Sequence, residues 1–141
     1  MIWKQQFTLE DLNKEPIPTM VEHLGIEFIE IGDDYLKAKM PVDHRTRQPY
    51  GLLHGGASCV LAETIGSVAA TMCIEDLNKR IAVGLQINAN HLSSATSGYV
   101  IGTAKPFKIG RRNSVWGIEI RTEDGKMICV SRLTMAIIDR R

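Results

Sequence analysis

One carboxylate stands inside the most apolar stretch of the chain. Glu63 is the single acidic or basic side chain between Ala57 and Cys73. If this stretch is helical, the residues around Glu63 on its face are small or apolar: Cys59, Val60, Gly66, Ser67 and Ala70. A solvent-facing stripe, the alternative, would carry Lys and Glu there. Because burying an unpaired carboxylate costs several kcal/mol, the pattern favours a buried Glu63 with a chemical role.

Hydrogen-bond donors directly precede this predicted helix. The sequence His54-Gly55-Gly56 leads into its first turn, where N–H groups lack internal acceptors and lie at the positive end of the helix dipole. Glycine lets a substrate approach that backbone, so the arrangement offers an oxyanion hole. His54 either orients the carbonyl or only marks the helix start, and Gln48 is either an amide donor or a polar loop residue. Ser67, one turn after Glu63, can hold a water or bond the carboxylate.

Together these groups meet the needs of a hydrolase. Such an enzyme requires a group that attacks or activates water and a donor where negative charge develops; here both lie within about two helical turns of sequence. The motifs GxSxG, GK[ST], HExxH and GxGxxG are absent from the sequence. Cys59 near His54 suggests a thiol nucleophile, but the apolar run that follows it favours a core thiol.

A basic cluster lies near the middle of the second half of the chain. Lys105, Lys108, Arg111 and Arg112 fall within nine residues of Lys105–Asn113. Such a run is often a solvated turn. In a chain of net charge +1 it also suits a polyphosphate ligand, and His91 can add a donor.

Length and composition are those of one ordinary domain, residues 1–141, with 44% apolar and 23% charged residues. The net charge of +1 argues against a general nucleic-acid binder. Cys59, Cys73 and Cys129 are expected to be buried reduced thiols, which fits a cytoplasmic location. The N-terminus lacks a secretory apolar region. The apolar stretch around Glu63 is short for a membrane span and is expected to be a core helix.

Periodicity and turn residues predict the order of elements. Two short helices are expected, one capped by Thr8 with Asp11 three residues later, the other over Thr19 to Leu24. Strands are expected at 26–31, 35–40, 81–92, 98–107, 113–121 and 127–138, and a long helix at 57–73. Along 81–92 the odd-numbered residues from Ile81 to Ile87 should share one face. Asp124-Gly125 marks a hairpin.

This order predicts an α+β fold. The four final strands favour an antiparallel meander. A helix that is apolar all round must be wrapped on most sides, and one curved antiparallel sheet around it satisfies both conditions. Because such a sheet has open edges, we expect pairing with a second copy.

Several motifs resemble the aryl-CoA (4-hydroxybenzoyl-CoA thioesterase-like) branch of the hotdog-fold acyl-CoA thioesterases. They are Met1-Ile2-Trp3-Lys4, Met40-Pro41-Val42-Asp43, Gln48 to Ser58, Leu61 to Ser67, Asn88-Ala89-Asn90-His91 and Ser131 to Thr134. The resemblance covers nearly the whole chain. It implies the hotdog fold, a curved sheet wrapped around one long central helix, and a dimer of dimers with active sites at subunit interfaces. It implies hydrolysis of acyl-CoA thioesters, without a cofactor, nucleic acid or membrane.

The resemblance also implies roles for single residues. Glu63 is then nucleophile or general base, Gly55 supplies the oxyanion N–H, Gln48 and His54 assist at the carbonyl, and Ser67 holds the hydrolytic water. Substrate-binding residues, chiefly for CoA, are Gly84, His91, Leu92, Ser93, Ser94, Lys108, Ile109, Gly110, Arg111, Arg112 and Asn113. Val68 points to the members that hydrolyse 1,4-dihydroxy-2-naphthoyl-CoA in menaquinone biosynthesis.

Other functions remain open on the sequence. Members that proofread enterobactin synthesis act on mis-acylated carrier proteins, so an acyl carrier protein is an alternative donor. Dehydratases and non-catalytic acyl-CoA-binding proteins share the fold. Ser93 stands where relatives usually carry Arg, Tyr50 replaces a usual Phe, and the connection from Glu75 to Arg80 is about two residues longer. These departures bear on substrate preference.

Overall fold

The computed structural model describes residues 1–14 and 16–141. The helices are α1 (Leu9–Asn13), α2 (Met20–His23) and α3 (Gly55–Met72). The strands are β1 (Glu27–Ile31), β2 (Leu36–Pro41), β3 (Arg80–His91), β4 (Tyr99–Ile109), β5 (Asn113–Thr122) and β6 (Met127–Asp139). Thr8 caps α1 in the predicted capping box, and Thr19 caps α2.

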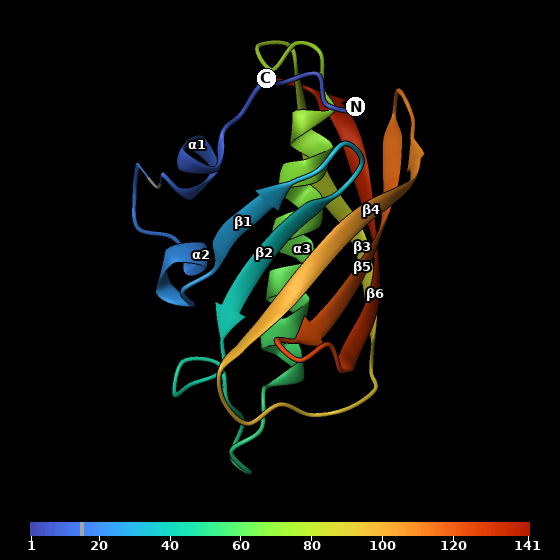
Figure 1. Cartoon of the computed structure of the whole chain (residues 1–141). Coiled ribbons are helices and arrows are strands. Elements are labelled where there is room, and N and C mark those ends of the chain that lie inside the picture. The colour runs from blue at the N-terminus through green and yellow to red at the C-terminus, as the bar shows by residue number, and fades with distance from the viewer. Residues whose placement is uncertain (15) are drawn as a thin grey trace.

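The six strands form one antiparallel sheet in the order β1-β2-β4-β5-β6-β3. The predicted meander therefore holds for β4, β5 and β6 only. After α3, the chain passes to the edge of the sheet opposite β1, where β3 pairs with β6. The chain crosses below the sheet between β3 and β4, as Figure 1 shows.

The sheet curves around α3, which confirms the predicted α+β hotdog arrangement (Figure 1). The buried face of α3 includes Leu61, Ala62, Ile65 and Ala69. From the sheet, Leu36, Ala38 and Met40 of β2 and Trp116, Ile118 and Ile120 of β5 are buried, as their alternation predicted. No helix in the described part of the chain is both long and apolar enough to cross a bilayer.

Two ends of the long helix and the strands lie two residues from the sequence prediction, and the others lie within one residue of it. α3 begins at Gly55, two residues before the expected start, because the His54 side chain accepts the Gly56 N–H and caps the helix there. β4 continues beyond Pro106 to Ile109. A register shift between Pro106 and Lys108 accommodates the residue that has no N–H to donate.

The predicted alternation along β3 is wrong. The register against β6 shifts between Gly84 and Gln86, so Leu85 is the extra residue of a β-bulge. Ala82 packs against the core before the bulge, whereas Ile87 and Ala89 do so after it. The inward face therefore changes from even-numbered to odd-numbered residues at Leu85.

Candidate active site

The start of α3 carries a backbone donor that has no partner in the described part of the chain. His54 accepts the Gly56 N–H through Nδ1 at 2.7 Å, and its carbonyl accepts the N–H groups of Ala57 and Ser58. The Gly55 N–H has no acceptor among the described residues. Because it lies at the positive end of an eighteen-residue helix, it is suited to bind a carbonyl oxygen that gains negative charge.

The loop before α3 holds Gln48 close to this helix start in the fold. Gln48 sits on a turn in which its N–H donates to the Leu52 carbonyl at 2.7 Å and its side-chain oxygen accepts the Tyr50 N–H. The His54 N–H in turn donates to the Thr46 carbonyl at 2.8 Å and ties this loop to the helix. Since the side-chain oxygen is engaged, the amide nitrogen of Gln48 is the group that can donate to a substrate.

Glu63 is exposed in the single chain, so the predicted burial of its carboxylate is wrong for one copy of the protein. The sheet covers the face of α3 that carries Leu61 and Ile65, and β3 is its last strand. The face with Glu63 therefore lies at the edge of the sheet. There the carboxylate rests against Gly84, where an added Cβ would meet Oε1 at 2.6 Å.

Ser67 lies one turn beyond Glu63 but is not bonded to it. Its hydroxyl donates to the Met135 sulfur at 3.7 Å. Thioether sulfur is a weak acceptor, so this hydroxyl can turn to a water at low cost. Val68 is half-buried and packs against the core. Cys59 is half-buried. Burial, and secondly the negative charge of Glu63, raise the pKa of its thiol, and this disfavours a nucleophilic thiolate.

His91 joins the helix start from the end of β3. An added Cβ at Gly55 would meet the His91 Nε2 at 2.7 Å, so the imidazole lies directly against this glycine. The following residues are exposed at the same end of the fold. The Leu92 N–H donates to the Ile128 carbonyl, the Ser93 hydroxyl to the Met127 carbonyl at 2.6 Å, and the Ser94 carbonyl accepts the Lys126 ammonium.

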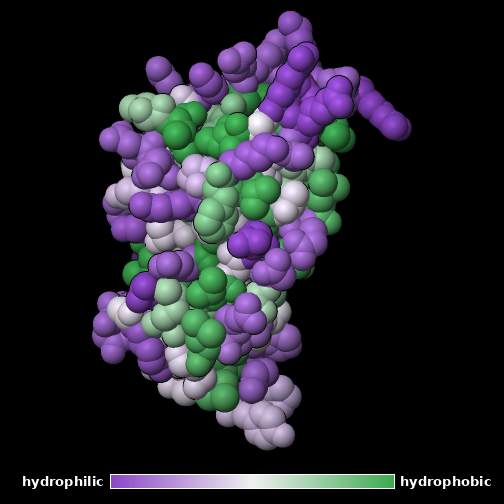
Figure 2. Space-filling model, turned by 90° about the vertical axis from the view of Figure 1, so that its right-hand side faces the viewer, coloured by the Kyte–Doolittle hydropathy of each residue, from purple (hydrophilic) through white to green (hydrophobic). Residues whose placement is uncertain are grey.

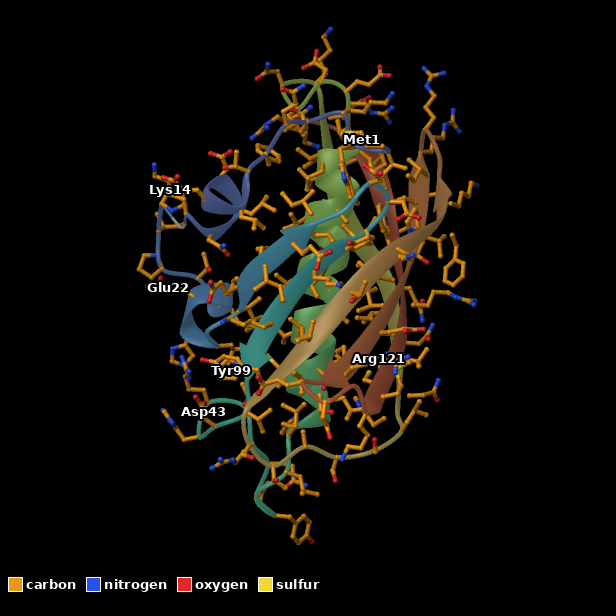
Figure 3. All side chains as sticks on the ribbon, in the orientation of Figure 1. Met1, Lys14, Glu22, Asp43, Tyr99 and Arg121 are labelled. Carbon is orange, nitrogen blue, oxygen red and sulfur yellow. The ribbon has the colours of Figure 1, made fainter. Side chains whose placement is uncertain are left out.

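The basic cluster lies at the other end of the molecule. It forms the β4–β5 hairpin Lys108–Asn113, in which the Gly110 N–H donates to the Asn113 carbonyl, and it lies beside the end of α3 and the start of β3 (Figure 1). Arg111 and Arg80 line the same cavity of about 540 Å³ there. Figure 2 shows hydrophilic residues crowded at this upper end. Asp43, on the loop that leads toward the start of α3, lies toward the lower end in Figure 3.

The structure thus brings some predicted site residues together and separates others. Glu63 with Gly84, and Gly55 with His54 and His91, form two neighbouring groups along α3. Lys108–Asn113 does not meet either group within one chain. Eight positions along α3 separate Gly55 from Glu63, about 12 Å of helix rise, so one thioester carbonyl cannot touch both directly. Their closeness in the sequence therefore does not bring them to the same bond within one chain.

Comparison with known proteins decides the family. Residues 50–129 match the thioesterase superfamily. The chain belongs to this superfamily. It is 57% identical to 1,4-dihydroxy-2-naphthoyl-CoA hydrolase from Escherichia coli, over 98% of this chain and 100% of that protein. It is 49% identical to the proofreading thioesterase EntH from Cronobacter turicensis, over 98% and 99% of the two chains.

Solved structures agree with this assignment to thioesterases. A thioesterase from Haemophilus influenzae superimposes with a TM-score of 0.94 at 53% identity, over 99% of this chain and 96% of that one. A mutant thioesterase from Pseudomonas aeruginosa superimposes with a TM-score of 0.96 at 45% identity, over 99% and 100%. The acyl-CoA thioesterase assignment made from the motifs around Glu63 is thereby confirmed at the level of the enzyme class.

One residue near the site was not predicted from the sequence. Leu85, the bulge residue of β3, follows directly on Gly84 and is 64% exposed. The sequence feature that could have indicated the bulge is Gly84, because an isolated glycine inside a strand pattern often marks one.

Proposed function

We propose that this protein hydrolyses aromatic acyl-CoA thioesters, such as 1,4-dihydroxy-2-naphthoyl-CoA in menaquinone biosynthesis, to free acid and CoA. The observation that carries the proposal is the free Gly55 N–H at the start of α3, on a helix that also presents the Glu63 carboxylate. Similarity to the naphthoyl-CoA hydrolase supports the aromatic acyl group. The three free cysteines suit a cytoplasmic location.

The chemistry needs only groups of the chain and water. The Gly55 N–H polarises the thioester carbonyl and stabilises the oxyanion, with Gln48 as a second donor. Glu63 either attacks the carbonyl carbon and forms an anhydride, or removes a proton from a water held by Ser67. In both cases the C–S bond breaks as the tetrahedral intermediate collapses. On the first route water then hydrolyses the anhydride, which releases the acid and restores the Glu63 carboxylate. CoA thiolate is a stable leaving group, so the reaction requires neither a strong acid nor a cofactor.

A second copy of the chain is needed to bring these groups to one bond, because one helix holds them too far apart. The two edges of the sheet differ in a way that favours one of them for pairing. At β1 the Asn13 side chain donates to the Phe28 carbonyl at 2.9 Å and accepts the Phe28 N–H at 2.8 Å, so this edge is occupied at Phe28. At β3 there is no acidic or basic side chain from Ile81 to Asn90, although charges commonly protect an edge strand. We place the partner along β3.

Antiparallel pairing along β3 completes the site. In a two-fold pair, the end of one β3 lies beside the start of the other. The end of β3 carries His91 against Gly55, and the start borders the basic hairpin around Arg111. The partner's hairpin is thereby carried toward this chain's helix start, and the partner's Glu63 approaches Gly55 from the opposite direction. Two such pairs form the proposed dimer of dimers.

The basic hairpin favours CoA as the donor. CoA carries a diphosphate and a 3′-phosphate, and guanidinium groups such as Arg111 and Arg112 bind phosphate in two-point contacts. Similarity to the proofreading thioesterase keeps an acyl carrier protein as the second candidate, since its phosphopantetheine arm presents the same thioester. Comparing turnover of one acyl group on CoA and on a carrier protein separates the two.

Glu63→Gln tests the proposed chemistry because it keeps size and removes charge. With benzoyl-CoA and 1,4-dihydroxy-2-naphthoyl-CoA, we expect the kcat to fall about 10²- to 10⁴-fold, with the oligomer intact. Glu22→Gln, an exposed glutamate on α2, is the matched control and should keep full activity. Near-normal turnover by Glu63→Gln would reject the mechanism. In a single turnover in ¹⁸O water, label in Glu63 identifies it as the nucleophile, whereas label in the acid alone is the result of the general base or of an anhydride opened at its acyl carbonyl.

A further inference from the structure

Both sides of the bulge in β3 serve the active site. Before the bulge, Gly84 faces α3 and meets the Glu63 carboxylate. After it, His91 faces α3 and meets Gly55. In a regular strand, residues 84 and 91 would point to opposite faces because side chains alternate with a period of two. The bulge takes Leu85 out of the alternation, so Gly84 and His91 both face the helix.

The space at Gly84 is limited by the Glu63 carboxylate, and its backbone conformation does not require glycine. Its φ is not positive, so its conformation is open to other residues. An added Cβ would meet only Glu63, with Oε1 at 2.6 Å and Cδ at 3.8 Å. Ordinary van der Waals contact begins near 3.4 Å, so a methyl group at this position must push the carboxylate away. Nothing else near Gly84 in the described chain resists the substitution.

We propose that Gly84 is a positioning residue for Glu63, and that the bulge at Leu85 lets the same strand present His91 to Gly55. This inference rests on the proposed function. The carboxylate packs directly against the backbone of Gly84, so this residue sets the position of the carboxylate relative to the thioester. Gly84 is thereby assigned to the geometry of the carboxylate instead of to substrate binding.

Gly84→Ala tests this assignment through kcat, KM and stability measured together. The carboxylate must move by the better part of 1 Å, and a misplacement of about 1 Å can cost about 10²-fold in rate. We expect kcat for benzoyl-CoA to fall about 10- to 100-fold, KM to stay within about twofold, and the thermal midpoint to stay the same or rise, since alanine is the better residue inside a strand.

Gly117→Ala is the matched control. Gly117 also lies inside a strand without a positive φ, and an added Cβ there would meet a side chain at 2.6 Å. That side chain is Phe107, which is 69% exposed and free to move. Gly117→Ala should therefore keep the kcat of the unmodified protein. A loss equal to that of Gly84→Ala would show a general effect of strand substitutions and overturn the proposal.

A double variant separates positioning from a merely structural effect. If Gly84 acts through the carboxylate, Gly84→Ala should cause no further loss of the residual rate in a Glu63→Gln background. An equal loss in both backgrounds would overturn the inference, as would normal kcat in Gly84→Ala. If Glu63→Gln itself keeps full turnover, the proposed function fails. If Glu63→Gln is inactive while Gly84→Ala is normal, only the present inference fails.

Two deletions test the second half of the proposal. Without Leu85, six positions separate Gly84 from His91, so a regular β3 keeps both on the helix side. Without both Leu85 and Gln86, five positions separate them, so His91 turns to the outer face. We expect the double deletion to lose at least as much kcat as His91→Ala, and the single deletion to keep more of it. Equal kcat in the two deletion variants would overturn the role of the bulge. If the double deletion prevents folding, one alanine inserted after Asn88, beyond the bulge, also turns His91 outward and carries the same expectation.

Discussion

The leucine at the centre of β3 offers a sharp test of pairing along the open edge. Leu85 is 64% exposed in the single chain and lies near the middle of the twelve-residue strand. Near the two-fold axis of an antiparallel pair, a residue comes close to its own counterpart. Leu85→Lys therefore places two like charges together and removes two apolar contacts. Ile17, 66% exposed just before α2, is the matched position for a control lysine.

The size of the effect follows from the exposed area. Burying a whole leucine side chain contributes about 1.5–3 kcal/mol, so the exposed part of Leu85 contributes about 1–2 kcal/mol in each subunit. Two subunits give about 2–4 kcal/mol, and two ammonium groups about 4 Å apart add about 1 kcal/mol of repulsion even in water. The sum of about 3–5 kcal/mol weakens the dimer roughly a hundredfold to several thousandfold. Folding of a single chain should change by less than about 0.5 kcal/mol.

Sedimentation velocity over a series of protein concentrations measures this change directly. Leu85→Lys should dissociate at concentrations where Ile17→Lys stays assembled. Its turnover of benzoyl-CoA should fall with the dissociated fraction and recover as the concentration rises. Two results would refute the reasoning: an unchanged dissociation constant would remove the partner from β3, and full turnover by the dissociated chain would show that one copy holds a complete site.

Three further outcomes follow from single contacts. His54→Ala removes the side-chain cap of α3 and should lower the free energy of unfolding by about 1 kcal/mol in urea titrations, whereas His54→Asn should restore most of it. Hydrogen bonds from Arg45 lower the pKa of Asp43 to about 2, so Asp43 stabilises the fold above the unfolded pKa of 3.8 and loses this effect as the pH falls toward 2; Asp43→Asn should flatten that acid limb in thermal melts. Asn13→Ala opens the β1 edge, and we expect about 1–3 kcal/mol of destabilisation and faster aggregation by light scattering.

Much of the fold could be predicted because local signals agree with the tertiary packing. The alternation of Leu36, Ala38 and Met40 against lysines specifies the buried face of β2, and Thr8 with Asp11 specifies the start of α1. The position of β3 beside β6 could not be read in the same way. Consecutive strands usually pair, and no residue between β3 and β4 signals the crossover that separates them.

The site was predictable as chemistry and less so as geometry. The residue types at Glu63, Gly55 and Gln48 are enough to indicate a carboxylate and carbonyl-binding donors. Their neighbourhood in the sequence suggested one local site, yet helix rise keeps Glu63 and Gly55 about 12 Å apart. The exposure of Glu63 was also missed, because a helical pattern of small residues around a carboxylate describes equally a buried face and a face that only a second chain covers.

The exposure of Glu63 in the single chain links assembly of the protein to its activity. In the single chain, the Gly55 N–H lacks an acceptor within the described residues, Glu63 is exposed, and β3 leaves its outer hydrogen-bonding groups unpaired. All three features lie along the edge where we place the partner. An exposed carboxylate is well hydrated and a weak nucleophile, and covering it strengthens its interactions as water leaves. Pairing would thus complete the sheet and activate Glu63 in one step, so an isolated chain should fold yet hydrolyse thioesters poorly.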